Sequence, residues 1–219
     1  NIHISESAKI LAGTILDATD GPIIVDDNVF VDIGALIKGP AYIGKASTIN
    51  PGAKIRGNVS IGPYCKVGGE VEDTTLHGYS NKQHDGYIGH SYIGEWVNLG
   101  ANTNNSDLKN NYSNVKFQIG ENLIDTEQMF LGCMIGDYTK TGISTMINTG
   151  TYIGLGCNLF GGDFQPKQVQ SFSWGAEERM NLDKFLKTLK IVKERRDSIV
   201  TKAEKALITK FHNFSKNTN

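Results

Sequence analysis

The chain has 219 residues, enough for one large domain or for one domain with an appendage. Its 22 basic and 23 acidic residues nearly cancel, which argues against a protein that binds nucleic acid or an anionic membrane surface. The chain contains no apolar stretch long enough to span a bilayer and no signal-peptide pattern at its start. We therefore expect a cytoplasmic protein. Because it opens with Asn1 rather than methionine, we also expect a preceding domain.

Aliphatic residues recur at every sixth position over the first third of the chain. A glycine often follows the aliphatic residue, and the residue two places before it is small or medium in size. A six-residue period fits neither an α-helix nor an alternating strand. It predicts a parallel β-helix in which three short strands form one turn and the aliphatic residue points inward. The residues in this register are Val25, Val31, Ile37, Ile43, Ile49, Ile55, Ile61 and Val67.

The same period returns later, at Ile135, Thr141, Ile147, Ile153 and Leu159. All three cysteines occupy the small-residue position, two places before an inward residue: Cys65, Cys133 and Cys157. An odd, widely spaced set without a CxxC pair is a poor disulfide framework and a poor thiolate metal site. We expect the three cysteines to be reduced packing residues.

Two polar segments interrupt the repeat, at residues 76–86 and 102–116, and Ile93 and Leu99 keep the six-residue step between them. Loops on a rigid scaffold are where functional residues commonly lie. The sequence therefore places the candidate site in these two segments.

The last part of the chain has a helical character, so we divide it into a β-helix over 1–175 and a helical extension over 176–219. Asn181 is a candidate N-cap. One helical stripe follows it, made of Leu182, Phe185, Leu186, Leu189 and Val192. We expect a helix or helical hairpin that covers the open end of the β-helix or docks on a neighbouring subunit.

The stretch HDGYIGHSYIGEWVNLGANT, residues 84–103, resembles the acetyltransferase domain of the bifunctional N-acetylglucosamine-1-phosphate uridyltransferase/glucosamine-1-phosphate acetyltransferase family. That family carries a similar histidine, a tyrosine-isoleucine-glycine, a second isoleucine-glycine and an asparagine before a glycine-alanine pair. The segments SDLK (106–109) and KTGISTMINTG (140–150) extend the likeness. The resemblance implies a left-handed parallel β-helix, a homotrimer, and transfer of an acetyl group from acetyl-CoA to a small amino-sugar substrate.

Carried over by position, His84 matches the family's catalytic base, and Tyr87 and Asn98 match its sugar-contacting residues. Asp107 stands where the family has a substrate-orienting asparagine, and Lys116 lies near a family lysine. The resemblance therefore implies that Tyr87, Asn98, Asp107 and Lys116 bind substrate.

The family's basic residues for the sugar phosphate have no clear match. Asn50 stands where an arginine is expected, and residues 68–70 (GGE) occupy the region of a second basic residue. A sugar-1-phosphate needs cations or several N–H donors, for which Arg56, Lys66 and Lys82 are candidates. Whether the acceptor is an amino-sugar or its 1-phosphate is left open.

Acetyl transfer to an amine requires a neutral amine, a nearby thioester carbonyl and a stabilised oxyanion. A histidine can accept the amine proton near neutral pH, a role that we assign to His84 and that contributes about 10² to 10⁴ in rate. Backbone N–H groups near Gly100 and Ala101 are candidate oxyanion donors. Asp107 either orients the sugar or hydrogen-bonds His84.

We expect CoA to lie along the later coils, with Lys140 and Lys167 as candidate ligands of its phosphates. A non-catalytic alternative is a β-helix that assembles or regulates a sugar-1-phosphate nucleotidyltransferase. A second alternative is a zinc enzyme of the γ-carbonic-anhydrase type, in which His77, His84 and His90 would have to meet at a subunit interface. The spacing of these histidines does not match that family, so we expect no metal.

Overall fold

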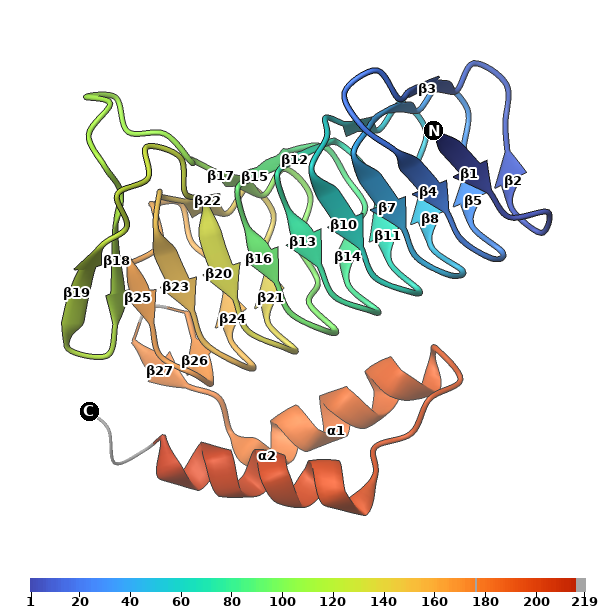
Figure 1. The fold of residues 1–219 in the computed structure, drawn as a ribbon. Helices are drawn as coiled ribbons and strands as arrows, with labels where there is room; N and C mark the ends of the chain where they lie inside the picture. The colour runs from blue at the N-terminus through green and yellow to red at the C-terminus, as the bar shows by residue number, and fades with distance from the viewer. Residues whose placement is uncertain (176, 216–219) are drawn as a thin grey trace.

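A computed structural model describes residues 1–175 and 177–215, which form a parallel β-helix followed by two α-helices (Figure 1). Each turn contributes one short strand to each of three faces, here named A, B and C. Face A is one continuous nine-stranded sheet. Its strands, in order along the axis, are β1 (Ile2–Ile4), β4 (Ile23–Val25), β7 (Ala41–Ile43), β10 (Val59–Ile61), β13 (Thr75–Leu76), β16 (Tyr92–Ile93), β20 (Cys133–Ile135), β23 (Thr151–Ile153) and β25 (Gln168–Val169).

Face B consists of two sheets that are joined through Asn98, which bridges to Asn81 on one side and to Lys140 on the other. The strands of the first sheet are β2 (Lys9–Ile10), β5 (Phe30–Val31), β8 (Thr48–Ile49), β11 (Lys66–Val67) and β14 (Asn81–Lys82). Those of the second are β21 (Lys140–Thr141), β24 (Asn158–Leu159), β26 (Ser173–Trp174) and the antiparallel β27 (Glu178–Arg179). Strand β27 carries the sheet past residue 175, where the sequence placed the domain boundary.

Face C also continues from one sheet into a second. The first sheet holds β3 (Ile15–Asp17), β6 (Leu36–Lys38), β9 (Lys54–Ile55), β12 (Glu70–Glu72) and β15 (Tyr87–Gly89), and the second holds β17 (Asn104–Asn105) and β22 (Met146–Ile147). The parallel pairing of these strands confirms the predicted β-helix.

The core is a column of aliphatic side chains inside the coil, and all eight residues of the first predicted register are buried. Burial of one such side chain stabilises the fold by about 1.5–3 kcal/mol. The three cysteines are also buried and free, and burial raises the pKa of each thiol to about 11. The prediction that they are packing residues is confirmed.

The segment 76–86 is not an excursion, contrary to the prediction. It forms β14, whose residues pair with β11 as in any other coil. The corners on either side of β12 are short, so the inward positions fall at Val71 and Leu76 instead of keeping the six-residue step. The register change, together with the polar Lys82 at an inward position, hid the repeat in the sequence.

The real excursion leaves the coil after β17 and returns at β20. It contains an antiparallel hairpin, β18 (Lys116–Ile119) with β19 (Asn122–Asp125), which projects from the C-terminal part of the β-helix (Figure 1). The predicted loop over 102–116 therefore begins too early, because β17 still pairs with β22 inside the coil.

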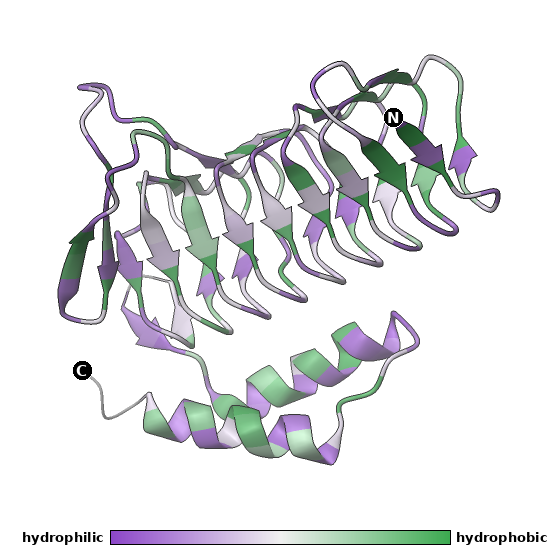
Figure 2. Cartoon of the chain, in the orientation of Figure 1, coloured by the Kyte–Doolittle hydropathy of each residue, from purple (hydrophilic) through white to green (hydrophobic). Residues whose placement is uncertain are grey.

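The helices α1 (Leu182–Glu194) and α2 (Lys202–Phe214) lie along the side of the β-helix and do not cover its open end, so the first of the two predicted roles is wrong (Figure 1). Docking on a neighbouring subunit stays a prediction. Both helices carry apolar and polar residues in mixed order along the chain (Figure 2), as expected of amphipathic helices with one apolar face. The predicted N-cap is confirmed, since Asn181 Oδ1 accepts a hydrogen bond from the Lys184 backbone N–H. No helix in the described ranges is long and apolar enough to cross a membrane.

The helical hairpin docks on aromatic side chains at the corner between faces A and B. There Tyr79 stacks between Tyr64 and Trp96, with ring centroids 4.8 Å and 4.1 Å away. Lys193 of α1 places its ammonium 5.1 Å from the Trp96 ring, a cation–π contact. Arg196 donates to the Tyr64 carbonyl at 3.1 Å, which ties the end of α1 to the coil.

Candidate functional site

His84 lies at the corner between faces B and C, two residues after the end of β14. Its side chain is exposed and lines a cavity of about 620 Å³. Within the described part of the chain, no hydrogen bond engages the imidazole, so its nitrogens are free to meet a ligand. The other lining residues are Asn50, Pro51, Gly68, Gly69, Gln83, Asp85, Ala101 and Asn102.

A buried ammonium group lies beneath this corner. Lys82 is 1% exposed, and its Nζ donates to the carbonyl oxygens of His84 at 2.5 Å and of Gly68 at 3.2 Å. Burial lowers the pKa of Lys82 to about 8. Gly69 has a φ of +67°, and a Cβ there would lie 2.7 Å from Lys82 Nζ, so only glycine fits this corner. Lys82 is therefore not available to a phosphate in the cavity, contrary to one suggestion from the sequence.

A second cavity, of about 320 Å³, adjoins the first on face C. The two share Gly69, Asp85 and Asn102, and Tyr87 lines the second. Together they form a groove, here called the face-C groove, which runs from His84 to Tyr87. The structure thus brings two of the predicted site residues onto one groove.

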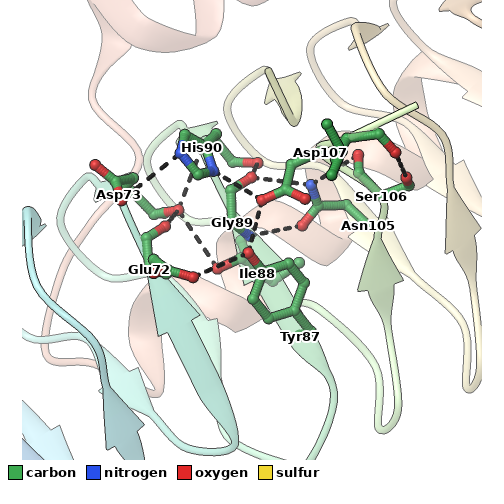
Figure 3. A network of polar contacts seen from close by, with 12 residues as sticks. Glu72, Asp73, Tyr87, Ile88, Gly89, His90, Asn105, Ser106 and Asp107 are labelled. Atoms are coloured by element: carbon green, nitrogen blue, oxygen red, sulfur yellow. Dashed lines mark hydrogen bonds and ion pairs between the residues drawn. The ribbon is translucent and has the colours of Figure 1, made fainter. Parts of the chain in front are cut away.

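Tyr87 belongs to a polar network at the far side of face C (Figure 3). Its hydroxyl donates to Asp107 Oδ2 at 2.6 Å, and Glu72 Oε2 lies 3.3 Å from the Tyr87 hydroxyl oxygen. Burial and these two carboxylates raise the pKa of Tyr87 far above its usual value, so the phenol stays protonated. His90 Nδ1 lies 2.7 Å from Asp107 Oδ2. Asp107 therefore pairs with His90, which the sequence considered only as a zinc ligand, and not with His84.

Asn105 holds the two ends of this network together. Its side chain accepts from the Gly89 N–H at 2.8 Å and donates to the Gly89 carbonyl at 2.9 Å, in the manner of a neighbouring strand. His90 directly follows Gly89, and Asp107 lies two residues after Asn105. This side-chain bridge fixes both members of the His90–Asp107 pair.

The network is rich in carboxylates. Arg56 contacts Glu70 at 2.8 Å and Glu72 at 3.1 Å, and His90 Nε2 lies 3.7 Å from Asp73 Oδ2. Arg56 is thereby neutralised and is a poor phosphate ligand. No lysine or arginine lines the His84 cavity in the described structure.

The remaining predicted substrate ligands lie elsewhere. Asn98 lies on face B, where its Oδ1 accepts from Asn81 Nδ2 at 3.2 Å, and Arg196 donates to Asn81 from the helical hairpin. Lys116 lies on the projecting hairpin, paired in register with Asp125. Neither residue reaches Tyr87 within one chain.

The two predicted CoA ligands are also apart. Lys140 faces α1 from face B and lines a cavity there, and burial lowers its pKa. Lys167 donates to the Thr149 carbonyl and, at 3.1 Å, to Thr149 Oγ1. Burial and the nearby Lys109 lower the pKa of Lys167.

The three histidines of the zinc alternative lie at three different corners of one coil, because β13, β14 and β15 each end just before one of them. His77 packs on Tyr92, with ring centroids 4.8 Å apart. Among the residues that the structure describes, no group of three or more His, Cys, Asp and Glu side chains is placed to hold a metal ion.

Fold and repeat together define the class: a parallel β-helix built from hexapeptide repeats. Residues 40–72 match the bacterial transferase hexapeptide (six repeats) family. The chain is also similar to bifunctional protein GlmU of Acaryochloris marina, with 29% identity over 171 residues, which cover 76% of this chain and 33% of the relative. The resemblance read from residues 84–103 is thereby confirmed.

A second relative agrees in kind. A bifunctional sugar-1-phosphate nucleotidylyltransferase/acetyltransferase of Sulfurisphaera tokodaii is 32% identical over 144 residues, covering 65% of this chain and 36% of that protein. The chain therefore spans about a third of the length of these relatives. Among solved structures, a UDP-N-acetylglucosamine acyltransferase from Campylobacter jejuni aligns over 78% of this chain and 68% of its own, with 15% identity and a TM-score of 0.30.

Proposed function

We propose that the chain is a CoA-dependent N-acetyltransferase that acts on an amino-sugar, with the face-C groove as the acceptor site. One observation carries this proposal: an unengaged histidine and a fixed, protonated tyrosine line the same groove. The relative from Sulfurisphaera tokodaii, whose name includes an acetyltransferase, supports the same reaction class.

In the proposed reaction, the amine nitrogen attacks the thioester carbonyl carbon while His84 accepts the amine proton. The carbon–sulfur bond then breaks, and the thiolate leaves and is protonated, which yields an amide and free CoA. General base catalysis of this kind contributes about 10² to 10⁴ in rate. Because its proton is donated to Asp107, the Tyr87 hydroxyl would accept a hydrogen bond from a sugar hydroxyl, and Asp107, itself paired with His90, holds Tyr87 in place.

The charge of the groove favours an acceptor without a phosphate next to Tyr87. Four carboxylates, those of Glu70, Glu72, Asp73 and Asp107, lie there, against the cations Lys54 and Arg56 and one histidine. A phosphate dianion beside these carboxylates would be repelled. We therefore propose a free amino-sugar, or one whose phosphate points away from this cluster.

The second candidate is a non-catalytic β-helix that assembles or regulates a sugar-1-phosphate nucleotidyltransferase. The same carboxylates favour it, because they leave the groove without a site for the phosphate of an amino-sugar 1-phosphate. A panel assay separates the two functions. Purified protein is mixed with acetyl-CoA and a series of amino-sugars and their 1-phosphates, and thiol release is followed. We expect turnover with an unphosphorylated amino-sugar, whereas no turnover with any acceptor supports the non-catalytic function.

A further inference from the structure

The corner that carries His84 presents a second titratable side chain, which the proposed reaction does not use. Asp85 directly follows His84 and lines both cavities of the face-C groove. Its side chain is exposed. Within the described ranges its carboxylate takes part in no ion pair and in no hydrogen bond. This carboxylate is therefore open to a ligand in the groove.

The backbone around Asp85 is held by the neighbouring coils. The Asp85 carbonyl oxygen accepts a hydrogen bond from the Asn102 N–H at 2.8 Å, which ties the corner to the next coil. Gly86 has a φ of +122°, and a Cβ there would collide with the Thr103 carbonyl oxygen, so only glycine fits beside Asp85. The corner thus presents the side chains of His84 and Asp85 from a fixed backbone, as the orientation of a substrate requires.

The other carboxylate that lines the groove is already paired. Glu70 lies 2.8 Å from Arg56, which neutralises it. The lysine that lines the groove, Lys54, belongs to the second cavity and not to the cavity of His84. Among the described residues, Asp85 is therefore the only Asp, Glu, Lys or Arg that lines the His84 cavity, and it makes that cavity selective for a cation.

Lys82 offers Asp85 a structural role as an alternative. The ammonium group of Lys82 lies beneath the same corner, and the charge of Asp85 opposes the fall in the pKa of Lys82 that burial causes. This interaction is electrostatic and does not occupy the carboxylate, because Lys82 Nζ donates to the carbonyl oxygens of His84 and Gly68. The Asp85 oxygens remain available as hydrogen-bond acceptors.

The acceptor of the proposed reaction supplies a matching cation. Primary amines have pKa values of about 8 to 10, so an amino-sugar arrives largely as its ammonium ion. A carboxylate forms short, strong hydrogen bonds with an ammonium group. An ammonium group held by Asp85 would lie in the same cavity as the His84 imidazole. It would release one proton to water before the attack, and His84 would accept the second as the carbon–nitrogen bond forms.

We infer that Asp85 binds the ammonium form of the acceptor and makes the face-C groove select an amine over a hydroxyl at the same position of the sugar. The inference rests on the proposed function and adds the residue that recognises the amine. It also excludes sugars with a carboxylate or phosphate beside the amine, because that anion would face Asp85.

The test is a calorimetric titration of the full chain, without acetyl-CoA, with pairs of sugars that differ only in an amine or a hydroxyl. The pairs are glucosamine and glucose, galactosamine and galactose, and mannosamine and mannose. We expect at least one amino-sugar to bind about tenfold more tightly than its partner, and Asp85→Asn to lose this preference.

Asp163→Asn is the matched control. Asp163 is an exposed aspartate between β24 on face B and Phe164, which bridges to β22 on face C, so it lies at the same kind of corner in a later coil. It lines neither cavity of the groove, and its replacement should leave the preference unchanged. Thermal melts separate the structural alternative, because loss of support for Lys82 would lower the melting temperature and weaken both sugars of a pair equally.

Two results of the titration overturn the inference: no preference for the amine in any pair, or a preference that Asp85→Asn retains. Acetyl-CoA turnover with an unchanged KM for the acceptor in Asp85→Asn also overturns it, but leaves the proposed acetyltransferase intact. A preference for the amine that Asp85→Asn abolishes, without turnover of any acceptor, has the opposite meaning. That result supports the role of Asp85 and contradicts the proposed function.

Discussion

Lys82 shows how a single polar residue can occupy an inward position of this coil. The neighbouring coils place Ile49 and Val67 in register with it. The lysine stem fills the same apolar column, while the ammonium group reaches the carbonyls of the His84 corner. Those hydrogen bonds offset part of the cost of burying a charge. Because a lysine in a polar segment resembles a surface residue, the sequence alone could not predict this burial.

This burial makes stability depend on pH. The pKa of Lys82 is about 8 in the folded chain and 10.5 as its ordinary value, so between these pH values the unfolded chain binds more protons. Stability therefore rises with pH across that window. From pH 7.5 to 9.5 we expect the Lys82 contribution to unfolding free energy to rise by about 2 kcal/mol. The three buried thiols act in the opposite direction over the same window, because their pKa is raised from 9.0 to about 11. The readout is therefore the unfolding free energy of the parent minus that of Lys82→Met in urea titrations, and this difference should rise by about 2 kcal/mol from pH 7.5 to 9.5.

The pairing of Asp107 with His90 is a second residue-scale result. The sequence indicated Tyr87 and Asp107 as neighbours in function, and the structure joins them at 2.6 Å. The sequence could not indicate the His90–Asp107 contact, because it depends on the side-chain bridge that Asn105 forms between the two coils.

Tyr87→Phe tests the proposed sugar contact. The variant loses the hydrogen bond to Asp107, which should lower the unfolding free energy by about 1 kcal/mol. If Tyr87 binds the acceptor, KM for the amino-sugar should rise about tenfold while kcat changes by less than threefold. Steady-state kinetics with varied acceptor give both values. An unchanged KM would remove Tyr87 from the acceptor site.

At the scale of elements, the hydrophobic register predicted the strands, but not where corners shorten. Loss of two residues before Val71 and one before Leu76 keeps both side chains inward while it breaks the six-residue count. The stripe on α1 likewise predicted a helix, and its buried members Phe185 and Leu189 pack with Phe172 and Ile208. The side of the β-helix on which the helical hairpin docks depends on the aromatic side chains at the corner between faces A and B. No local sequence pattern predicts that these side chains stack together.

A buried ion pair secures the hairpin. Glu204 Oε1 lies 2.6 Å from Lys193 Nζ and accepts from the Tyr138 hydroxyl, also at 2.6 Å. Burial alone would raise the pKa of Glu204, but the hydrogen bonds from Lys193 and Tyr138 outweigh it and lower the pKa. This stabilisation is therefore present at neutral pH and is lost as the pH falls below the ordinary carboxyl value of 4.5.

Glu204→Gln should lower the unfolding free energy by about 1–3 kcal/mol at pH 7, because Lys193 keeps its charge in a buried place without its partner. The difference between this variant and the parent should shrink on acidification below pH 4.5. Thermal melts of both proteins at pH 7 and pH 4 measure this. Glu194→Gln is the control, since Glu194 forms only an exposed pair with Lys190. A difference independent of pH would mean that the ion pair does not stabilise the hairpin.

At the scale of the whole molecule, the predicted ligands are divided among different surfaces of one chain. Tyr87 lies on face C, Asn98 and Lys140 on face B, and Lys116 on the projecting hairpin. The sequence could align each residue with a family position, but a single chain cannot show which positions meet. A neighbouring copy could place its own face B or hairpin against the face-C groove.

The resemblance noted in the sequence implies a homotrimer, and we propose that the ligands meet across its subunits. Sedimentation equilibrium of this 219-residue chain should give about 72 kDa, three times the 23.9 kDa of one chain. Lys116→Ala in such a trimer should weaken acceptor binding although Lys116 is remote from Tyr87 within its own chain. A monomer at micromolar concentration that retains full turnover would contradict this arrangement.

The most direct test of the central claim is thiol release from acetyl-CoA in the presence of the preferred amino-sugar, with His84→Ala and a matched His77→Ala variant. His84 is exposed and unengaged, so its removal should leave the melting temperature unchanged. We expect a loss of about 10² to 10⁴ in kcat for His84→Ala and near-normal turnover for His77→Ala. Full activity in His84→Ala would contradict the assignment of this groove as the site of acetyl transfer.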